Sequence, residues 1–410
     1  MTEWAGAAPA AVRSEIALGP PLVSGRSAVR FVKDPVTQMY YKLGLPESFL
    51  LDCLQRRLPT EEILTKYQRE FGCTITADRV RAFIEQMRPR GLLEGTPQGA
   101  LEATANRVAA ERGRKNLLRA RWPNQWLTQL VRRAAPAFAW MLAPALMVPL
   151  SVFGLSVCFF VLAMVPLWAS ERTALATTLP AALLLALSVI VHEFFHAVAC
   201  ARAGGNAQEV GIMWRAPVFV AYCTVDDVVL FRSRRDRVVT AYAGTYANLL
   251  LMLAGAVMLK TVPSGSAVHR VVAAYLFMSA VAVLVNLVPL FGLDGYRMLE
   301  HSLGVWSLQS SSFSYVRSRV TGAQRPLHAR VALIYWIYAL STTAAGGGIL
   351  CALGLIWWRT LRPLVGAAWS AGILAGEAGL VVLVSMVILR HRKPKGLSGP
   401  RFEQFGRTSG

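Results

Sequence analysis

The chain has 410 residues, of which 54% are hydrophobic and only 16% charged, and its net charge is +20. This composition is too apolar for a water-soluble globular protein and far too apolar for a disordered chain. Of the 43 Lys and Arg residues, 21 precede residue 136 and six lie among the last 21 residues, which is typical of a polytopic membrane protein with basic flanks on one side.

The N-terminus and the cysteines exclude the secreted classes. Met1–Pro21 lacks a basic segment followed by an apolar one, so no signal peptide is expected. The six cysteines form no C-x-x-C pair, and we expect reduced thiols. A secreted soluble enzyme and a disulfide-stapled scaffold are therefore both excluded.

Residues 1–100 are expected to form a small soluble domain. From Arg30, the alternating stretch FVKDPVTQMYYKLGL with its Asp-Pro turn predicts a β-hairpin. Three helices should follow, with Thr76 as the N-cap of the third; their ranges are 47–57, 59–71 and 76–87. Two strands and three short helices indicate an α+β, winged-helix-like domain.

Residues 101–135 form a basic segment that we expect to be a linker or a surface helix. Trp122 and Trp126 lie within it and suit a segment at the membrane surface.

Residues 136–392 should contain the membrane domain. Six apolar stretches are each long enough to supply the ~20 helical residues that cross a bilayer; they are 138–168, 174–200, 238–260, 269–292, 329–357 and 363–389. With the N-terminus in the cytoplasm, the outer loops hold only Arg172, Arg359 and Arg362, whereas the inner loops hold most of the other Lys and Arg residues of this region. We therefore predict a mostly α, six-span protein of the inner (cytoplasmic) membrane, with both termini, including a basic tail at 393–410, in the cytoplasm.

The second apolar stretch contains the sequence His192-Glu193-Phe-Phe-His196. Residues i and i+4 lie one turn apart on nearly the same helix face, so both imidazoles can bind one Zn²⁺, and Glu193 can act as the general base. Ionisable residues at membrane depth are functional candidates by default. The alternative is that these residues only cap the helix near the cytoplasmic interface.

Asp294 is the expected third ligand, because a catalytic zinc takes three protein ligands and keeps one open position. It follows the fourth apolar stretch, which ends on the same side of the membrane as the second. Pro289 and Gly292 should unwind the helix there, as membrane proteins tolerate where backbone lines a polar cavity. The alternative role for Asp294 is the N-cap of a following surface helix.

Together these motifs resemble the site-2 protease family of intramembrane zinc metallopeptidases. HExxH in one span is followed by N-x-x-P-x-x-x-L-D-G, here Asn286 to Gly295, at the end of a later one. Between them, Gly244 to Asn248 resembles the Gly-x-x-x-Asn motif of that family, with Thr245 in place of its usual Pro. The resemblance implies that His192, His196 and Asp294 bind zinc, that Glu193 is the base, and that Asn248 and Asn286 assist.

A closer resemblance is to a bacterial branch of peptide zinc metalloproteases that carry an N-terminal, peptide-binding-like winged helix. These have a Tyr-Cys loop before an Arg-rich turn, here Tyr222-Cys223 and then Phe231-Arg-Ser-Arg-Arg-Asp. Two departures, Ala221 and Thr224, lie where the branch usually has Pro and Asp, and they concern the substrate and not the zinc site.

The expected activity is hydrolysis of a peptide bond at or within the membrane, in a ribosomally made peptide precursor or a membrane-anchored peptide. Residues 208–222 predict short strands that could hold an extended substrate by strand addition or could instead only plug the cavity. Trp214, Tyr222 and Asp227 are the candidate substrate contacts. Asn248 and Asn286 could supply an oxyanion-binding amide or only join helices.

Two other functions stay open. The protein could be a non-catalytic membrane subunit of a peptide-export or immunity system, working with exporter subunits and keeping zinc for structure. The N-terminal domain could bind DNA, although its third helix mixes charges, and peptide docking is favoured over nucleic acid.

Overall fold

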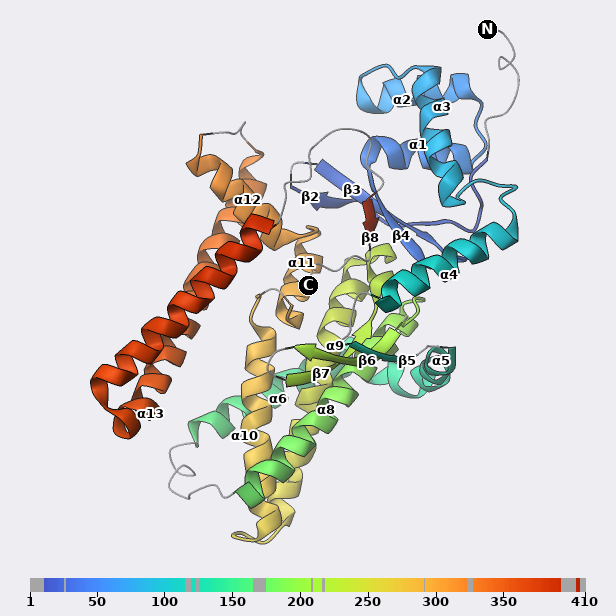
Figure 1. Ribbon diagram of the computed structural model, residues 1–410. Helices are drawn as coiled ribbons and strands as arrows, with labels where there is room; N and C mark the ends of the chain where they lie inside the picture. The colour runs from blue at the N-terminus through green and yellow to red at the C-terminus, as the bar shows by residue number, and fades with distance from the viewer. Residues whose placement is uncertain are drawn as a thin grey trace. The chain divides into compact units, whose positions relative to one another are not determined.

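The structure is a computed structural model that describes residues 11–25, 27–114, 119–122, 125–164, 175–207, 209–215, 218–290, 292–322, 327–391 and 403–405. It is mostly helical (Figure 1). The chain separates into two compact units, residues 1–307 with 402–410 and residues 308–401, which are described separately.

The first unit begins with the small α+β domain. Its strands are β1 (Ala17–Leu18), β2 (Leu22–Ser24), β3 (Ser27–Asp34) and β4 (Met39–Gly44), and its helices are α1 (Leu45–Gln55), α2 (Thr60–Phe71) and α3 (Ala77–Met87). The expected hairpin and three helices are thus confirmed, and the Thr76 hydroxyl caps α3 by accepting from the Arg79 N–H. The sheet order is β1-β3-β4-β8, with β2 also on β3 and β8 (Glu403–Phe405) supplied by the end of the chain.

The segment expected to be a linker or surface helix holds regular structure. It contains β5 (Arg119–Trp122) and most of α4 (Gln98–Arg114) and α5 (Gln125–Ala139). Strand β5 joins β6 (Glu209–Arg215) and β7 (Val218–Thr224) in an antiparallel sheet of order β5-β6-β7. The strands expected in 208–222 are therefore present, and β7 lies at an edge of this sheet.

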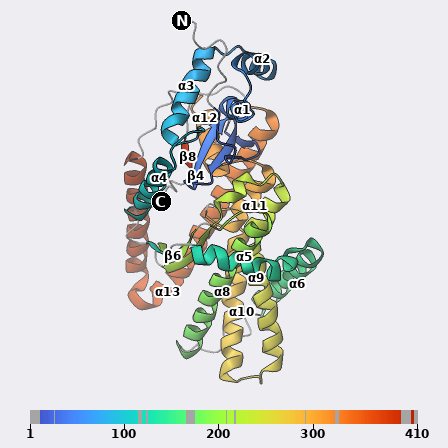
Figure 2. The same cartoon turned by 90° about the vertical axis from the view of Figure 1, so that its right-hand side faces the viewer.

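Four helices in the described part of the chain are long and apolar enough to cross a membrane: α6 (Pro144–Ala163), α8 (Leu175–Arg202), α9 (Arg234–Thr261) and α10 (Ala267–Leu287). They correspond to the first four predicted spans, and α8, α9 and α10 pack against one another (Figure 2). Many apolar side chains on their outer faces are exposed, such as Phe159, Phe160 and Leu183, as expected for surfaces that meet lipid. These four helices are consistent with a helical membrane protein.

The second unit contains α12 (Leu308–Val320) and α13 (Ala329–His391). Both remaining predicted spans fall within α13, which is interrupted at Gly366, where φ is 81° and ψ is 166°. The total number of spans stays a prediction. Of the predicted tail, only residues 403–405 are described.

Candidate metal centre

Helix α8 presents two imidazoles to the interior of the helix bundle. His192 and His196 are 8% and 7% exposed, and their Nε2 atoms lie 3.2 Å apart. The four-residue spacing places both rings on the face of α8 that packs against α9. Two adjacent imidazole nitrogens at this depth need a shared proton or a shared ligand between them.

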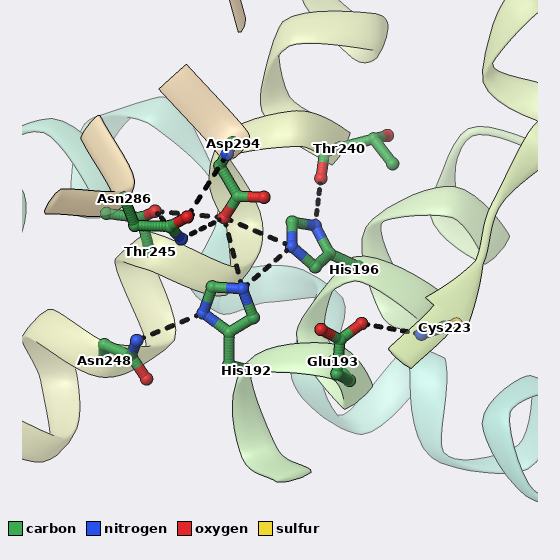
Figure 3. A network of polar contacts seen from close by, with 9 residues as sticks. All are labelled: His192, Glu193, His196, Cys223, Thr240, Thr245, Asn248, Asn286 and Asp294. Atoms are coloured by element: carbon green, nitrogen blue, oxygen red, sulfur yellow. Dashed lines mark hydrogen bonds and ion pairs between the residues drawn. The ribbon is translucent and has the colours of Figure 1, made fainter. Parts of the chain in front are cut away.

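Asp294 reaches the same point from a different element. Helix α10 ends at Leu287 because Val288, which precedes Pro289, is extended, with φ −65° and ψ 132°. A turn with Gly292 at φ 90° then leads into α11 (Asp294–Leu303). The carboxylate oxygen Oδ2 lies 3.2 Å from His192 Nε2 and 3.4 Å from His196 Nε2 (Figure 3).

These three separations match the edges of a metal-ligand tetrahedron. Zinc with nitrogen and oxygen ligands at about 2.0–2.1 Å has ligand–ligand edges of about 3.3 Å. The two nitrogens and the oxygen are 3.2, 3.2 and 3.4 Å from one another. Among the described residues, this group of His and carboxylate side chains has the geometry to hold a metal ion.

Asp294 does not occupy the N-cap position that was its alternative role. Leu293 occupies the N-cap position of α11, and its side chain accepts no capping hydrogen bond. Asp294 is the first helical residue, and 13% of its side chain is exposed. Its carboxylate is therefore available to the imidazoles.

A second layer of hydrogen bonds orients the three groups. His196 Nδ1 lies 2.7 Å from the carbonyl oxygen of Thr240, which fixes the proton on Nδ1 and leaves Nε2 free to bind a metal. The Asn286 amide donates to Asp294 Oδ2 over 2.7 Å and accepts from the Asp294 N–H over 3.3 Å. The Thr245 hydroxyl donates to the same Oδ2 over 3.2 Å. Asn248 lies against His192 instead, with Nδ2 3.1 Å from Nδ1.

Two of these orienting residues were not among the predicted site residues. Thr240 acts through its backbone carbonyl, which any residue type would supply, so no sequence signal could have identified it. Thr245 was noticed only as a departure from the family pattern, and here it is a donor to the carboxylate. Asn248 contacts the candidate ligand His192, and Asn286 contacts the candidate ligand Asp294 and also donates to the Thr245 hydroxyl over 3.3 Å.

Position 244 must be glycine because the α9 backbone passes close to both imidazole rings. A Cβ built at this position would overlap His196 Nε2 and lie 2.5 Å from His192 Nε2. Only glycine therefore lets the α9 backbone pass directly beside the site.

Glu193 contacts the edge of the three-stranded sheet. Its Oε2 accepts a 2.7 Å hydrogen bond from the Cys223 N–H on β7 (Figure 3). Because β7 is the outermost described strand of this sheet and packs against α8, the carboxylate lies where β7 meets the metal-ligand group. Burial, with the nearby Glu193 carboxylate, raises the pKa of the Cys223 thiol well above its usual value, so this cysteine is a neutral thiol.

The ionisation of Asp294 suits metal binding. Burial alone would raise the pKa of its carboxyl, but the neighbouring imidazoles of His196 and His192 lower that pKa well below its usual range. The group is therefore a carboxylate at neutral pH.

The predicted substrate-strand residues separate in the structure. Tyr222 lies on β7 and is buried, and Trp214 lies on β6 with its side chain outside the described residues. Asp227 was wrongly grouped with them. It lies beyond the strand in η3 (Asp226–Leu230), and its carboxylate is held by Lys33, Tyr40 and the Asn206 N–H. Because this carboxylate is buried and already accepts from three donors, we expect Asp227 to have a structural role.

Comparison with known proteins adds no relative, because no family model, curated protein or solved structure matches the chain.

Proposed function

We propose that the chain is a zinc-dependent endopeptidase that hydrolyses a peptide bond at or within the membrane, as its resemblance to the site-2 proteases implies. The observation that carries the proposal is that His192 and His196 of α8 meet Asp294 of α11, 98 residues after His196, at tetrahedral separations and beside Glu193. A structural metal needs no general base, whereas a hydrolytic one does.

The ligand set suits zinc. Two imidazoles and one carboxylate are the donor types that zinc hydrolases use, and three protein ligands leave one position open. When bound, zinc activates water and polarises a scissile carbonyl. The Thr240 carbonyl, the Asn286 amide and the Thr245 hydroxyl hold the ligands in place before any substrate arrives.

Glu193 is the residue that moves the proton. The Cys223 N–H fixes Oε2, which leaves Oε1 to accept a proton from the attacking water and to return one to the leaving amine. This backbone contact gives the carboxylate one orientation, and a base so held needs less reorganisation during the reaction.

The substrate is proposed to bind as an extended strand on β7. A helical peptide hides its carbonyl groups, so it must be extended before it can be cut. Strand β7 is an edge strand, and Glu193 accepts from one of its amides, so a peptide added to this edge would lie beside the carboxylate. A peptide precursor or a membrane-anchored peptide fits this arrangement, and an exporter subunit is an expected partner.

The location is also part of the proposal. Basic loops place the N- and C-termini in the cytoplasm and the site near the cytoplasmic side of an inner membrane. The N-terminal domain is proposed to dock peptides. DNA binding is less favoured, because Arg81 and Arg88 of the α3 region form ion pairs with Asp78 and Glu85, which reduces the positive field available to phosphates.

The experiment is peptide cleavage by the purified protein in lipid nanodiscs, with fluorogenic membrane-anchored peptides. We expect cleavage that a zinc chelator abolishes, that added zinc restores, and that Glu193→Gln lacks. Zinc bound without Glu193-dependent cleavage of any peptide would favour the non-catalytic subunit.

A further inference from the structure

A buried ion pair joins the N-terminal sheet to the membrane domain. Lys33 Nζ on β3 lies 2.6 Å from Asp227 Oδ1 in η3, and their side chains are only 7% and 5% exposed. The Tyr40 hydroxyl donates to the same oxygen, and the Asn206 N–H donates to Oδ2 over 2.8 Å. Buried ion pairs persist only where the geometry is good and the remaining lone pairs are satisfied, so this contact is specific.

Apolar and backbone contacts surround the ion pair. Phe31 and Tyr40 share a buried cluster with Val229 of η3, and Trp306 lies edge-on to Phe31 with ring centroids 4.6 Å apart. A Cβ at Gly19 would lie 2.8 Å from the Val229 carbonyl oxygen, so the two backbones approach as closely as glycine allows.

Strand β2 makes a second attachment. The Val23 N–H donates to the Gly304 carbonyl over 3.0 Å, and the Trp306 N–H donates to the Val23 carbonyl over 2.6 Å. Val23 and Val305 form a parallel bridge. The N-terminal domain is thus paired by main-chain hydrogen bonds to the segment that leaves α11.

Both attached segments lead directly from the candidate site. Asp227 lies four residues after Cys223, whose N–H binds the Glu193 carboxylate. Gly304 follows α11, whose first residue is Asp294. The N-terminal domain therefore holds the chain at two points: just after Cys223, which contacts the proposed base Glu193, and just after α11, which begins with the third ligand Asp294.

We propose that the N-terminal domain is a positioning element of the site, in which Lys33 and Tyr40 fix Asp227 and so hold β7 against Glu193. Lys33 and Asp227 are positioning residues and touch no reacting group. The role of Glu193 as the base rests on the proposed function. The attachment of β7 by the ion pair does not depend on that function.

Hydrogen–deuterium exchange on the full-length protein in nanodiscs tests this claim. Lys33→Met should speed amide exchange across residues 219–224 on the order of tenfold or more, because it leaves Asp227 buried without its cation. Lys33→Arg restores the charge and should keep exchange near the wild-type rate. Arg13→Met is the matched control: it breaks a buried ion pair with Asp34 inside the same domain and should leave residues 219–224 unchanged.

A second variant leaves every charge in place. Gly19→Val should force the two backbones apart and speed the same exchange, whereas Gly99→Val, at a position with no atom within 4 Å of a Cβ, should not. If Lys33→Met does not fold, the comparison of Gly19→Val with Gly99→Val decides whether the N-terminal domain holds β7. Wild-type exchange of residues 219–224 in folded Gly19→Val protein would overturn the proposal.

The cleavage readout separates this inference from the proposed function. If peptides are cleaved, Lys33→Met should raise KM and lower kcat, because the loosened strand β7 is both the proposed substrate edge and the donor that orients Glu193. If nothing is cleaved, the exchange rates still decide whether the N-terminal domain positions β7.

Discussion

Asn248 Nδ2 lies 3.1 Å from His192 Nδ1, while Asn248 Oδ1 is buried and has no hydrogen-bond partner among the described residues. For His192 to bind a metal through Nε2, its proton must be on Nδ1, and the neighbouring atom must then be an acceptor. Rotation of the amide by half a turn brings Oδ1 to Nδ1 and satisfies both requirements. Asn248 Oδ1 is therefore available to accept a hydrogen bond from the Nδ1–H of His192, which a metal-binding imidazole at this position requires.

Asn248 should consequently control metal affinity. Asn248→Leu removes the acceptor and should weaken zinc binding about 10- to 100-fold. Asn248→Asp keeps an acceptor and should retain most of the affinity. Competition with a chromophoric chelator measures both variants, and equal affinities for Leu and Asp would argue against the proposed tautomer.

Gly244→Ala should abolish metal binding without unfolding the protein. Alanine favours helix by about 1 kcal/mol over glycine, so α9 should remain intact. The new methyl group, however, overlaps both imidazole Nε2 positions. Gly255→Ala on the same helix is the control, since its Cβ is tight only against the flexible end of Leu276 at 3.0 Å and lies at an ordinary 3.6 Å from Tyr275. Zinc content of the two purified variants gives the comparison, and a full zinc complement in Gly244→Ala would contradict the geometry.

The sequence predicted the candidate ligands because helix periodicity and membrane topology constrain them strongly. A four-residue spacing places His192 and His196 on one face, and the parity of the spans places Asp294 on the same side. The early end of α10 followed from Pro289. The hairpin and three helices of the N-terminal domain followed from alternation and capping.

What the sequence could not predict depends on long-range contacts. The fate of Asp227 depends on Lys33, 194 positions earlier, and nothing near Asp227 indicates that partner. The role of Thr240 is carried by a backbone carbonyl. The basic composition of residues 101–135 indicates a linker or surface helix and gives no sign of strand β5. This strand forms by pairing with β6, which is distant in sequence.

His301 should make the protein sensitive to acid. Burial, with the nearby Arg297 and Arg237, lowers the pKa of His301 to about 3, whereas an unfolded histidine titrates near about 6.5. The unfolded state therefore binds the proton first as the pH falls. The contribution to the free energy of unfolding is fully present above about pH 6.5 and is lost toward pH 3, by up to about 1.4 kcal/mol per pH unit.

Thermal unfolding at pH 7.0 and pH 4.5 checks this. His301→Asn should lose less stability between the two pH values than the wild type does. Substitution of the exposed His328 by Asn should leave the wild-type loss unchanged. An identical loss in His301→Asn would show that other groups cause the acid sensitivity.

Helix α13 should cross the membrane twice. Its 63 residues would extend about 95 Å if straight, against an apolar bilayer core of about 30 Å. The non-helical Gly366, just after Pro363, provides the turn. A cysteine at Thr360, in a cysteine-free background, should react with a membrane-impermeant maleimide from outside the cell, whereas a cysteine at Arg319 should react only after lysis. Thr360 labelling only after lysis would remove the last two predicted spans from the topology.

The central claim is that His192, His196 and Asp294 hold a zinc ion that Glu193 uses for hydrolysis. The most direct measurement is zinc content together with peptide cleavage, on detergent-purified wild type, Glu193→Gln and Asp294→Ala. We predict about one zinc per chain and cleavage in the wild type, about one zinc without cleavage in Glu193→Gln, and loss of both in Asp294→Ala. Wild-type protein without zinc, or Glu193→Gln that cleaves as fast as the wild type, would contradict the account.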